Sequence, residues 1–127
     1  IFEVTKMMNS ILNEYREMRI TKADLCEHLG DDLHNVEIAH AICVKAADVR
    51  NSIEKVLLGE KTLEELVDWV NVVWFTDLFH FPDTETDLIV SVLEVLETLD
   101  EEDAHISNEE LKNMQLALDE NKEYIPM

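Results

Sequence analysis

Two short patterns in this chain place a carboxylate and an imidazole three positions apart, Glu37 with His40 and Asp77 with His80. On a helix, residues at this spacing lie one turn apart on the same face. Paired Glu-x-x-His motifs with two further glutamates bind two metal ions in helical bundles, provided that all six side chains point inward. Here Glu37 lies on the polar stripe of its predicted helix and His40 at the edge of that stripe, and the second pair has aspartate where glutamate is usual. No inward-facing glutamates complete the set, so we expect no metal site and no cofactor.

The chain has two cysteines, Cys26 and Cys43. Glu27 and His28 follow Cys26, but adjacent residues of a helix point in different directions and do not make a nucleophile–base pair. The sequence contains no glycine-rich phosphate loop, no G-x-S-x-G turn and no zinc-type cysteine spacing. We therefore expect a protein that is not an enzyme. An isolated pair of cysteines makes no disulfide framework, and reduced, partly buried thiols are typical of a cytoplasmic protein.

The distribution of charge carries the clearest functional signal. Between Thr62 and Leu111 the chain has no lysine or arginine but fifteen Asp and Glu residues. Residues 60–127 hold nineteen acids and three bases, so nearly all of the formal net charge of -19 lies in this half. Carboxylates without counter-charges repel nucleic acids and membranes and attract basic surfaces. We therefore expect a basic protein partner, and no nucleic acid or membrane. The predicted partner-binding residues are Asp83, Glu85, Asp87, Glu94, Glu97, Asp100, Glu101, Glu102 and Asp103.

Five aromatic residues lie within thirteen consecutive positions of the second half. We expect most of them in the hydrophobic core. Aromatic side chains are also enriched at binding hot spots, so Trp74, Phe75 and Phe79 are candidates for an exposed hydrophobic interface. The all-round apolarity of residues 70–81 allows a homodimer that assembles through this segment.

The composition predicts a single all-helical domain over residues 1–127, with an acidic half at 60–127. Hydrophobic residues make up 46% of the chain, which is too many for a disordered acidic tail. Only two glycines and two prolines occur, so connections are few and short, as in a compact bundle of five to six helices. The longest strongly apolar run is far too short to cross a bilayer.

Apolar spacing and helix caps locate the expected helices. Capping-box patterns mark three helix starts, at Thr21 with Asp24, Thr62 with Glu65, and Ser107 with Glu110. The expected helices cover about residues 3–18, 21–29, 33–58, 84–99 and 107–118, with another that starts at residue 62.

Residues 72–81 are almost continuously apolar, a pattern that suits either a buried helix or a short strand. We expect a helix, because the sequence offers no second strand candidate with which a strand could pair. The tail from Asn121 to Met127 is expected to be frayed.

Residues 59–71, with the sequence GEKTLEELVDWVN, resemble a pattern in small acidic bacterial proteins of unknown function. Those proteins carry a glycine, a Ser or Thr cap, paired acids and an acid-Trp-Ala step, followed by an acidic helix and a closing capped helix. The predicted helices near 88–99 and 107–118 follow in the same order, so the resemblance covers the second half. Val70 stands where alanine is usual, and the apolar run replaces a more polar loop. Proteins of this kind often resemble immunity proteins of bacterial toxin systems, which implies a cytoplasmic bacterial protein that acts by binding.

These observations give one leading hypothesis and two alternatives from other classes. The leading hypothesis is an immunity or inhibitor protein that neutralises a basic toxin, such as a nuclease, by covering its basic site. A DNA-mimic antirestriction protein is a close relative of this idea. The first alternative is a homo-oligomeric structural or adaptor protein that assembles through residues 70–81. The least favoured is a helical-bundle metal enzyme.

Overall fold

Six helices and a short parallel strand pair make up the part of the chain that the computed structural model describes, residues 2–33, 41–100 and 105–125. The helices are α1 (Phe2–Arg16), α2 (Lys22–Leu29), α3 (Ala46–Leu57), α4 (Leu63–Phe75), α5 (Thr86–Glu97) and α6 (Asn108–Asp119). The strands are β1 (Ile42–Cys43) and β2 (Phe79–His80). The predicted fold class, a helical bundle, is confirmed.

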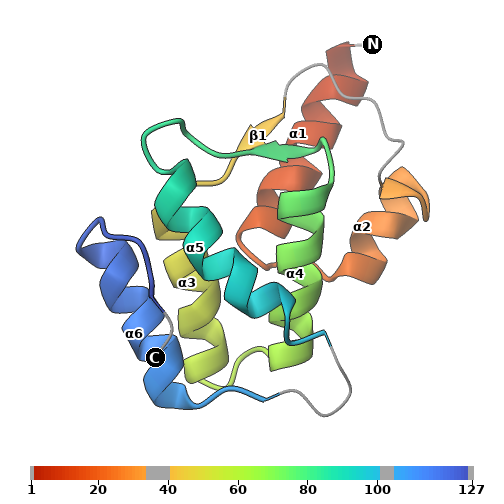
Figure 1. Cartoon of the computed structure of the whole chain (residues 1–127). Coiled ribbons are helices and arrows are strands. Elements are labelled where there is room, and N and C mark those ends of the chain that lie inside the picture. The colour runs from red at the N-terminus through yellow and green to blue at the C-terminus, as the bar shows by residue number, and fades with distance from the viewer. Residues whose placement is uncertain (1, 34–40, 101–104, 126–127) are drawn as a thin grey trace.

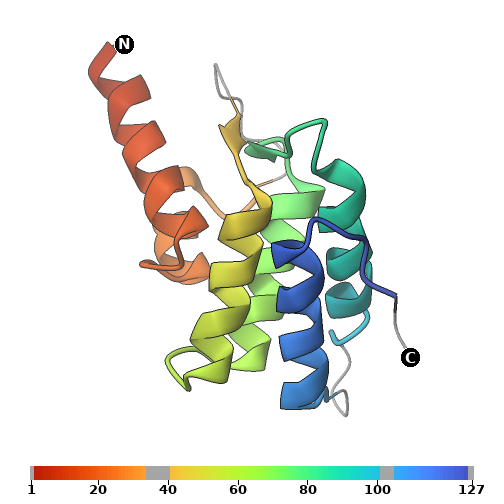
Figure 2. The same cartoon turned by 90° about the vertical axis from the view of Figure 1, so that its left-hand side faces the viewer.

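Four helices form the centre of the molecule. α3 packs along α6 and α4 packs against α5, and Figure 2 shows α3 and α6 side by side. α1 and α2 contact each other and lie to one side of these four helices (Figures 1 and 2). α5 contacts both α3 and α4, so it turns one face to the bundle and leaves the other on the surface.

The core is centred on α4, whose Trp69 is only 1% exposed. The indole Nε1–H of Trp69 donates hydrogen bonds to the carbonyl oxygens of Tyr15 and Arg16, at 3.2 Å each. A buried indole N–H needs such a partner, and these bonds tie α4 to the end of α1. Fully buried side chains from the other helices complete the core, among them Leu12, Leu25, Ile53, Ile89, Leu93, Leu96 and Met114.

Two of the predicted capping boxes are confirmed in full. The Thr21 hydroxyl accepts a hydrogen bond from the Asp24 amide at 3.1 Å, and the Asp24 carboxylate accepts one from the Thr21 amide at 3.0 Å. Thr62 and Glu65 make the same reciprocal pair at 3.1 and 3.2 Å. Hydrogen bonds from the Thr21 and Thr62 amides favour the charged carboxylates and hold the pKa values of Asp24 and Glu65 below their usual range.

β1 and β2 join two segments that are far apart in the sequence. The Ile42 amide donates to the Leu78 carbonyl oxygen at 2.9 Å, and the Val44 amide donates to the His80 carbonyl oxygen at 2.8 Å. Val44 and Leu78 are fully buried, so the strand pair is anchored in the core. Main-chain bonds between the two segments satisfy polar groups that helices would otherwise have satisfied internally.

Two sequence-based predictions are wrong at this strand pair. The expected helix over 33–58 is not continuous, because α3 begins only at Ala46; residues 34–40 lie outside the described part of the chain. The expected helix through 72–81 ends at Phe75. The sequence shows no partner for a strand after α4, because that partner, β1, lies inside a segment whose apolar pattern predicts a helix.

Thr76 accounts for the end of α4. Its hydroxyl donates to the Val72 carbonyl oxygen at 2.6 Å and accepts from the Leu78 amide at 3.3 Å. Its backbone is extended, with φ -114° and ψ 164°. A threonine that bonds to nearby backbone groups in this way offers them an alternative to a further helical turn.

The tail after α6 is fixed by local and distant hydrogen bonds. Asn121 has a left-handed backbone, with φ 59°. The Asn121 amide donates to Leu118 and the Lys122 amide to Ala117, the two bonds of a Schellman motif. The Tyr124 amide then donates to the Ser91 hydroxyl on α5 at 2.8 Å. The prediction of a frayed tail is therefore wrong for residues 121–124, which these hydrogen bonds attach to the bundle; residues 126–127 lie outside the described part.

Candidate functional site

Most of the predicted partner-binding carboxylates lie on or beside the outer surface of α5. Asp87 and Glu94 are exposed and seven residues apart, so they lie on one side of the helix, and Glu97 is half-buried one turn further on. Asp83 precedes the helix, Asp100 follows it, and both are exposed. We call these five residues the α5 acidic face.

The apolar pattern of α5 orients this face. Leu88, Ile89, Val92, Leu93 and Leu96 are buried against the bundle, and each is 5% exposed or less. Because these residues recur with the helical period, the exposed carboxylates of Asp87 and Glu94 lie on the opposite, solvent side of the helix. A helix of this length is about 18 Å long, so it displays the charges along an extended line.

Among the described residues, no lysine or arginine forms an ion pair with the α5 acidic face. Six ion pairs between a carboxylate and a lysine or arginine occur within the described ranges, and none of them involves this face. Their cations are Arg16, Arg19, Arg50, Lys61 and Lys122. Asp87 lies in the first turn of α5, where the helix dipole favours a negative charge. The helix dipole therefore accounts for the placement of Asp87 but not for that of the other four carboxylates of the α5 acidic face.

Glu85 does not belong to this face, although it lies between two of its members. Its side chain is half-buried, and its Oε1 accepts a hydrogen bond from the Ala46 amide at 3.1 Å. This amide is at the start of α3, where the first N–H groups have no partner within the helix. Glu85 therefore acts as a cap supplied from a distant segment.

The last three predicted partner-binding residues, Glu101, Glu102 and Asp103, lie outside the described residues.

The three aromatic residues proposed for an interface are not equally accessible. Phe79 is 6% exposed, and its ring centroid lies 6.2 Å from that of Tyr15, so it belongs to the core in this structure. Trp74 is half-buried and Phe75 is 45% exposed, and their rings stack with centroids 4.7 Å apart. The accessible apolar surface of this group is therefore mainly that of Phe75.

The carboxylate–histidine pairs do not form the arrangement considered from the sequence. Asp77 lies in a turn and His80 in β2, so they are not one helical turn apart. Glu37 and His40 lie outside the described residues. No group of three or more His, Cys, Asp or Glu side chains suited to holding a metal ion occurs in residues 2–33, 41–100 and 105–125. Both cysteines are free thiols and half-buried.

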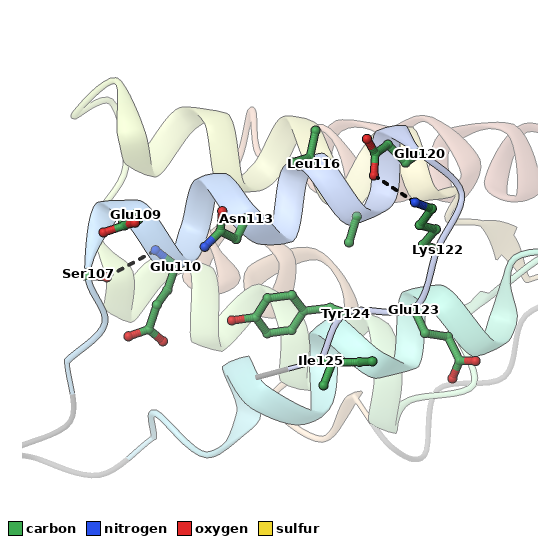
Figure 3. Close-up of a pocket in the computed structure, with 11 residues that line it drawn as sticks. Ser107, Glu109, Glu110, Asn113, Leu116, Glu120, Lys122, Glu123, Tyr124 and Ile125 are labelled. Carbon is green, nitrogen blue, oxygen red and sulfur yellow. Dashed lines mark hydrogen bonds and ion pairs between the residues drawn. The ribbon is translucent and has the colours of Figure 1, made fainter. Parts of the chain in front are cut away.

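A groove of about 560 Å³ between α6 and the tail was not foreseen from the sequence (Figure 3). We call it the C-terminal groove. Its lining combines carboxylates and other polar side chains with apolar ones: Ser107, Glu109, Glu110, Asn113, Leu116, Ala117, Glu120, Lys122, Glu123, Tyr124 and Ile125. At one end the Ser107 hydroxyl accepts a hydrogen bond from the Glu110 amide at 3.1 Å, which is one of the two bonds of the capping box expected for α6. The sequence signals that indicate such a groove are Asn121, which suits the end of the last helix, and the apolar Tyr124 and Ile125 three and four positions later.

Tyr124 forms one wall of the C-terminal groove. The tail runs back along α6, and the ring of Tyr124 lies across the space beneath that helix (Figure 3). Burial raises the pKa of the Tyr124 phenol, and the nearby charge of Glu110 raises it further. The phenol therefore stays protonated at neutral pH and remains a hydrogen-bond donor.

None of the described helices is long and apolar enough to cross a membrane. No family model, no curated protein and no solved structure matches this chain.

Proposed function

We propose that this protein is a non-enzymatic acidic binding protein of the bacterial cytoplasm, an immunity or inhibitor protein that neutralises a basic toxin such as a nuclease. The observation that carries the proposal is the α5 acidic face, whose carboxylates have no lysine or arginine partner in the described part of the chain. A nuclease cleft is built to hold phosphates. Carboxylates displayed on a rigid helix can occupy such a cleft and exclude the substrate.

Electrostatics decides what kind of binding this mechanism predicts. At physiological ionic strength a charge is screened over about 8 Å, so a cluster of unpaired carboxylates attracts a basic surface before contact. Such steering raises the association rate more than it slows dissociation. We therefore expect fast, salt-sensitive association with a basic partner.

The test is a pull-down from cells that naturally make the protein, followed by kinetics with the recovered partner. The variant Glu94→Lys/Glu97→Lys/Asp100→Lys changes the formal net charge from -19 to -13. We expect its association rate to fall about tenfold or more at low salt, because steering depends on local charge. Helical circular dichroism should not change, since these side chains make no described ion pairs.

A matched control makes the same change in net charge elsewhere. Glu27, Asp31 and Glu60 are exposed and lie on or next to α2 and after α3. Reversal of these three to lysine should leave the association rate close to that of the parent protein. Equal losses for both triple variants would show that only net charge matters, and unchanged binding in the α5 variant would remove the proposal.

The stacked pair of Trp74 and Phe75 favours a second candidate function, a homo-oligomeric structural or adaptor protein. Phe75 exposes 45% of its surface on the last turn of α4, where an apolar contact with a second copy is possible. Sedimentation velocity over a wide concentration range tests this idea. A mass that rises with concentration, and that returns to the monomer value in Phe75→Ser, would support self-assembly in place of a toxin partner.

A further inference from the structure

The C-terminal groove contains an unusual share of the exposed apolar surface. Four large hydrophobic side chains are exposed in the described ranges, namely Leu58, Phe75, Leu116 and Ile125. Leu116 is 54% exposed and Ile125 is 79% exposed, and both line this groove. Ala117 and the ring of Tyr124 extend the apolar lining between them. Concentrated exposed apolar surface of this kind marks interaction sites more often than isolated exposed residues do.

Carboxylates surround this apolar lining. Glu109 and Glu110 come from the first turn of α6, and Glu123 comes from the tail (Figure 3). None of these three forms an ion pair with a lysine or arginine among the described residues. The single cation of the lining, Lys122, is paired with Glu120 at 3.5 Å. An occupant would therefore meet an apolar surface within a negative field.

Hydrogen bonds hold the tail in place, so the groove is formed before anything binds. The Schellman motif at Asn121 turns the chain back, and the bond from the Tyr124 amide to Ser91 attaches it to α5. The Ser91 hydroxyl is itself fixed, because it donates to the Leu88 carbonyl oxygen at 2.6 Å. A preformed site loses less conformational entropy on binding than one that must first be ordered.

We infer that the C-terminal groove binds a short amphipathic, cationic segment of another protein, with an apolar side chain between α6 and the tail and lysines or arginines against Glu109, Glu110 and Glu123. Charge complementarity selects this occupant over an acidic or purely apolar one, because the lining places carboxylates that have no lysine or arginine partner in the described ranges beside the exposed Leu116 and Ile125. The groove uses different residues from the α5 acidic face. The inference therefore goes beyond the proposed function and holds whether or not a toxin is the partner.

The test uses the full chain and two labelled peptides of equal positive charge. One carries lysines with leucines at helical spacing, and the other has serines in place of the leucines. We expect the leucine peptide to bind about tenfold or more tightly, the ratio that corresponds to burial of a single large apolar side chain. Fluorescence anisotropy measures both affinities. Equal affinities would overturn the inference, since they would leave only unspecific attraction to an acidic protein.

Matched variants localise the binding. Leu116→Ser with Ile125→Ser should remove the preference for the leucine peptide, whereas Leu58→Ser with Phe75→Ser should retain it. All four residues are exposed, so neither variant is expected to unfold the protein. Equal loss in the two double variants would contradict the assignment to this groove.

The charged part of the site has its own control. Glu109→Gln with Glu123→Gln should lower the affinity for the leucine peptide and make that affinity less dependent on salt. Glu27→Gln with Glu60→Gln should change neither the affinity nor its salt dependence. Amide chemical-shift changes should fall on α6 and residues 121–125. Changes confined to the α5 acidic face would refute the proposed site and would instead support binding there.

Discussion

Replacement of Glu85 by alanine should destabilise the fold while leaving any charge-driven association nearly intact. Its Oε1 accepts a hydrogen bond from the Ala46 amide at 3.1 Å, and Ala46 is buried at the start of α3. Loss of a capping side chain costs about 1 kcal/mol in most proteins, and a charged acceptor raises this to about 1.5–2 kcal/mol. Urea denaturation followed by far-UV circular dichroism measures the change. Glu94→Ala, on the same segment but exposed, should stay within about 0.5 kcal/mol of the parent protein.

A double-mutant cycle tests whether the Ala46 amide is the partner. Proline lacks the N–H and is tolerated at the first position of a helix. The preceding residue, Lys45, already has the extended backbone that proline requires of its neighbour, with φ -97° and ψ 166°. Ala46→Pro should therefore cost less stability in the Glu85→Ala background than in the parent protein. Additive losses of unfolding free energy in the double variant would refute the cap. A loss for Glu85→Ala no larger than that for Glu94→Ala would refute it as well.

Three further predictions concern other fixed points of the structure. Trp69→Phe removes the donor to the Tyr15 and Arg16 carbonyl oxygens and leaves a space in the core, so the free energy of unfolding should fall by about 2–4 kcal/mol in urea titrations. Asn121→Ala should lower the free energy of unfolding by about 1 kcal/mol, because alanine is strained at φ 59°. Asn121→Gly should cause no such loss, and thermal unfolding of the two variants measures the difference. The pKa of Glu65 is lowered on folding, so its contribution to stability is present above the unfolded value of 4.5 and is lost as the pH falls through the folded value. Glu65→Gln keeps a capping acceptor but cannot titrate, so urea midpoints measured below pH 5 should fall less steeply with acid than those of the parent protein.

Features set by local sequence were predictable. Thr21 with Asp24 and Thr62 with Glu65 carry their capping partners three residues away, and both reciprocal hydrogen bonds form. The outward placement of Glu94 follows in the same way from the apolar period of α5. In each case the atoms that decide the geometry lie within two helical turns of one another. Capping residues and the spacing of apolar residues are therefore enough to predict the local structure.

Features set by distant partners were not predictable. Ile42 and Val44 bond to Leu78 and His80, more than thirty positions away, and each segment alone looks helical or ambiguous. The same holds for the tail, where Tyr124 is attached to Ser91 on another helix. No pattern within a window of a few turns contains these pairings, because tertiary contacts override local preference in short apolar runs.

The same distinction changes how the acidic segment should be tested. Asp83, Glu85 and Asp87 occupy every second position of a five-residue segment and contribute equally to the formal charge. Glu85, however, is turned inward to α3, whereas Asp83 and Asp87 are exposed. Charge counting predicts the sign of the charge on a partner but cannot separate a carboxylate that would bind from one that holds the fold together. A loss of binding in a variant that includes Glu85 would therefore mix lost stability with lost electrostatic attraction. Association rates should be compared only among variants of exposed carboxylates whose urea midpoints match, and the α5 acidic face supplies enough of them.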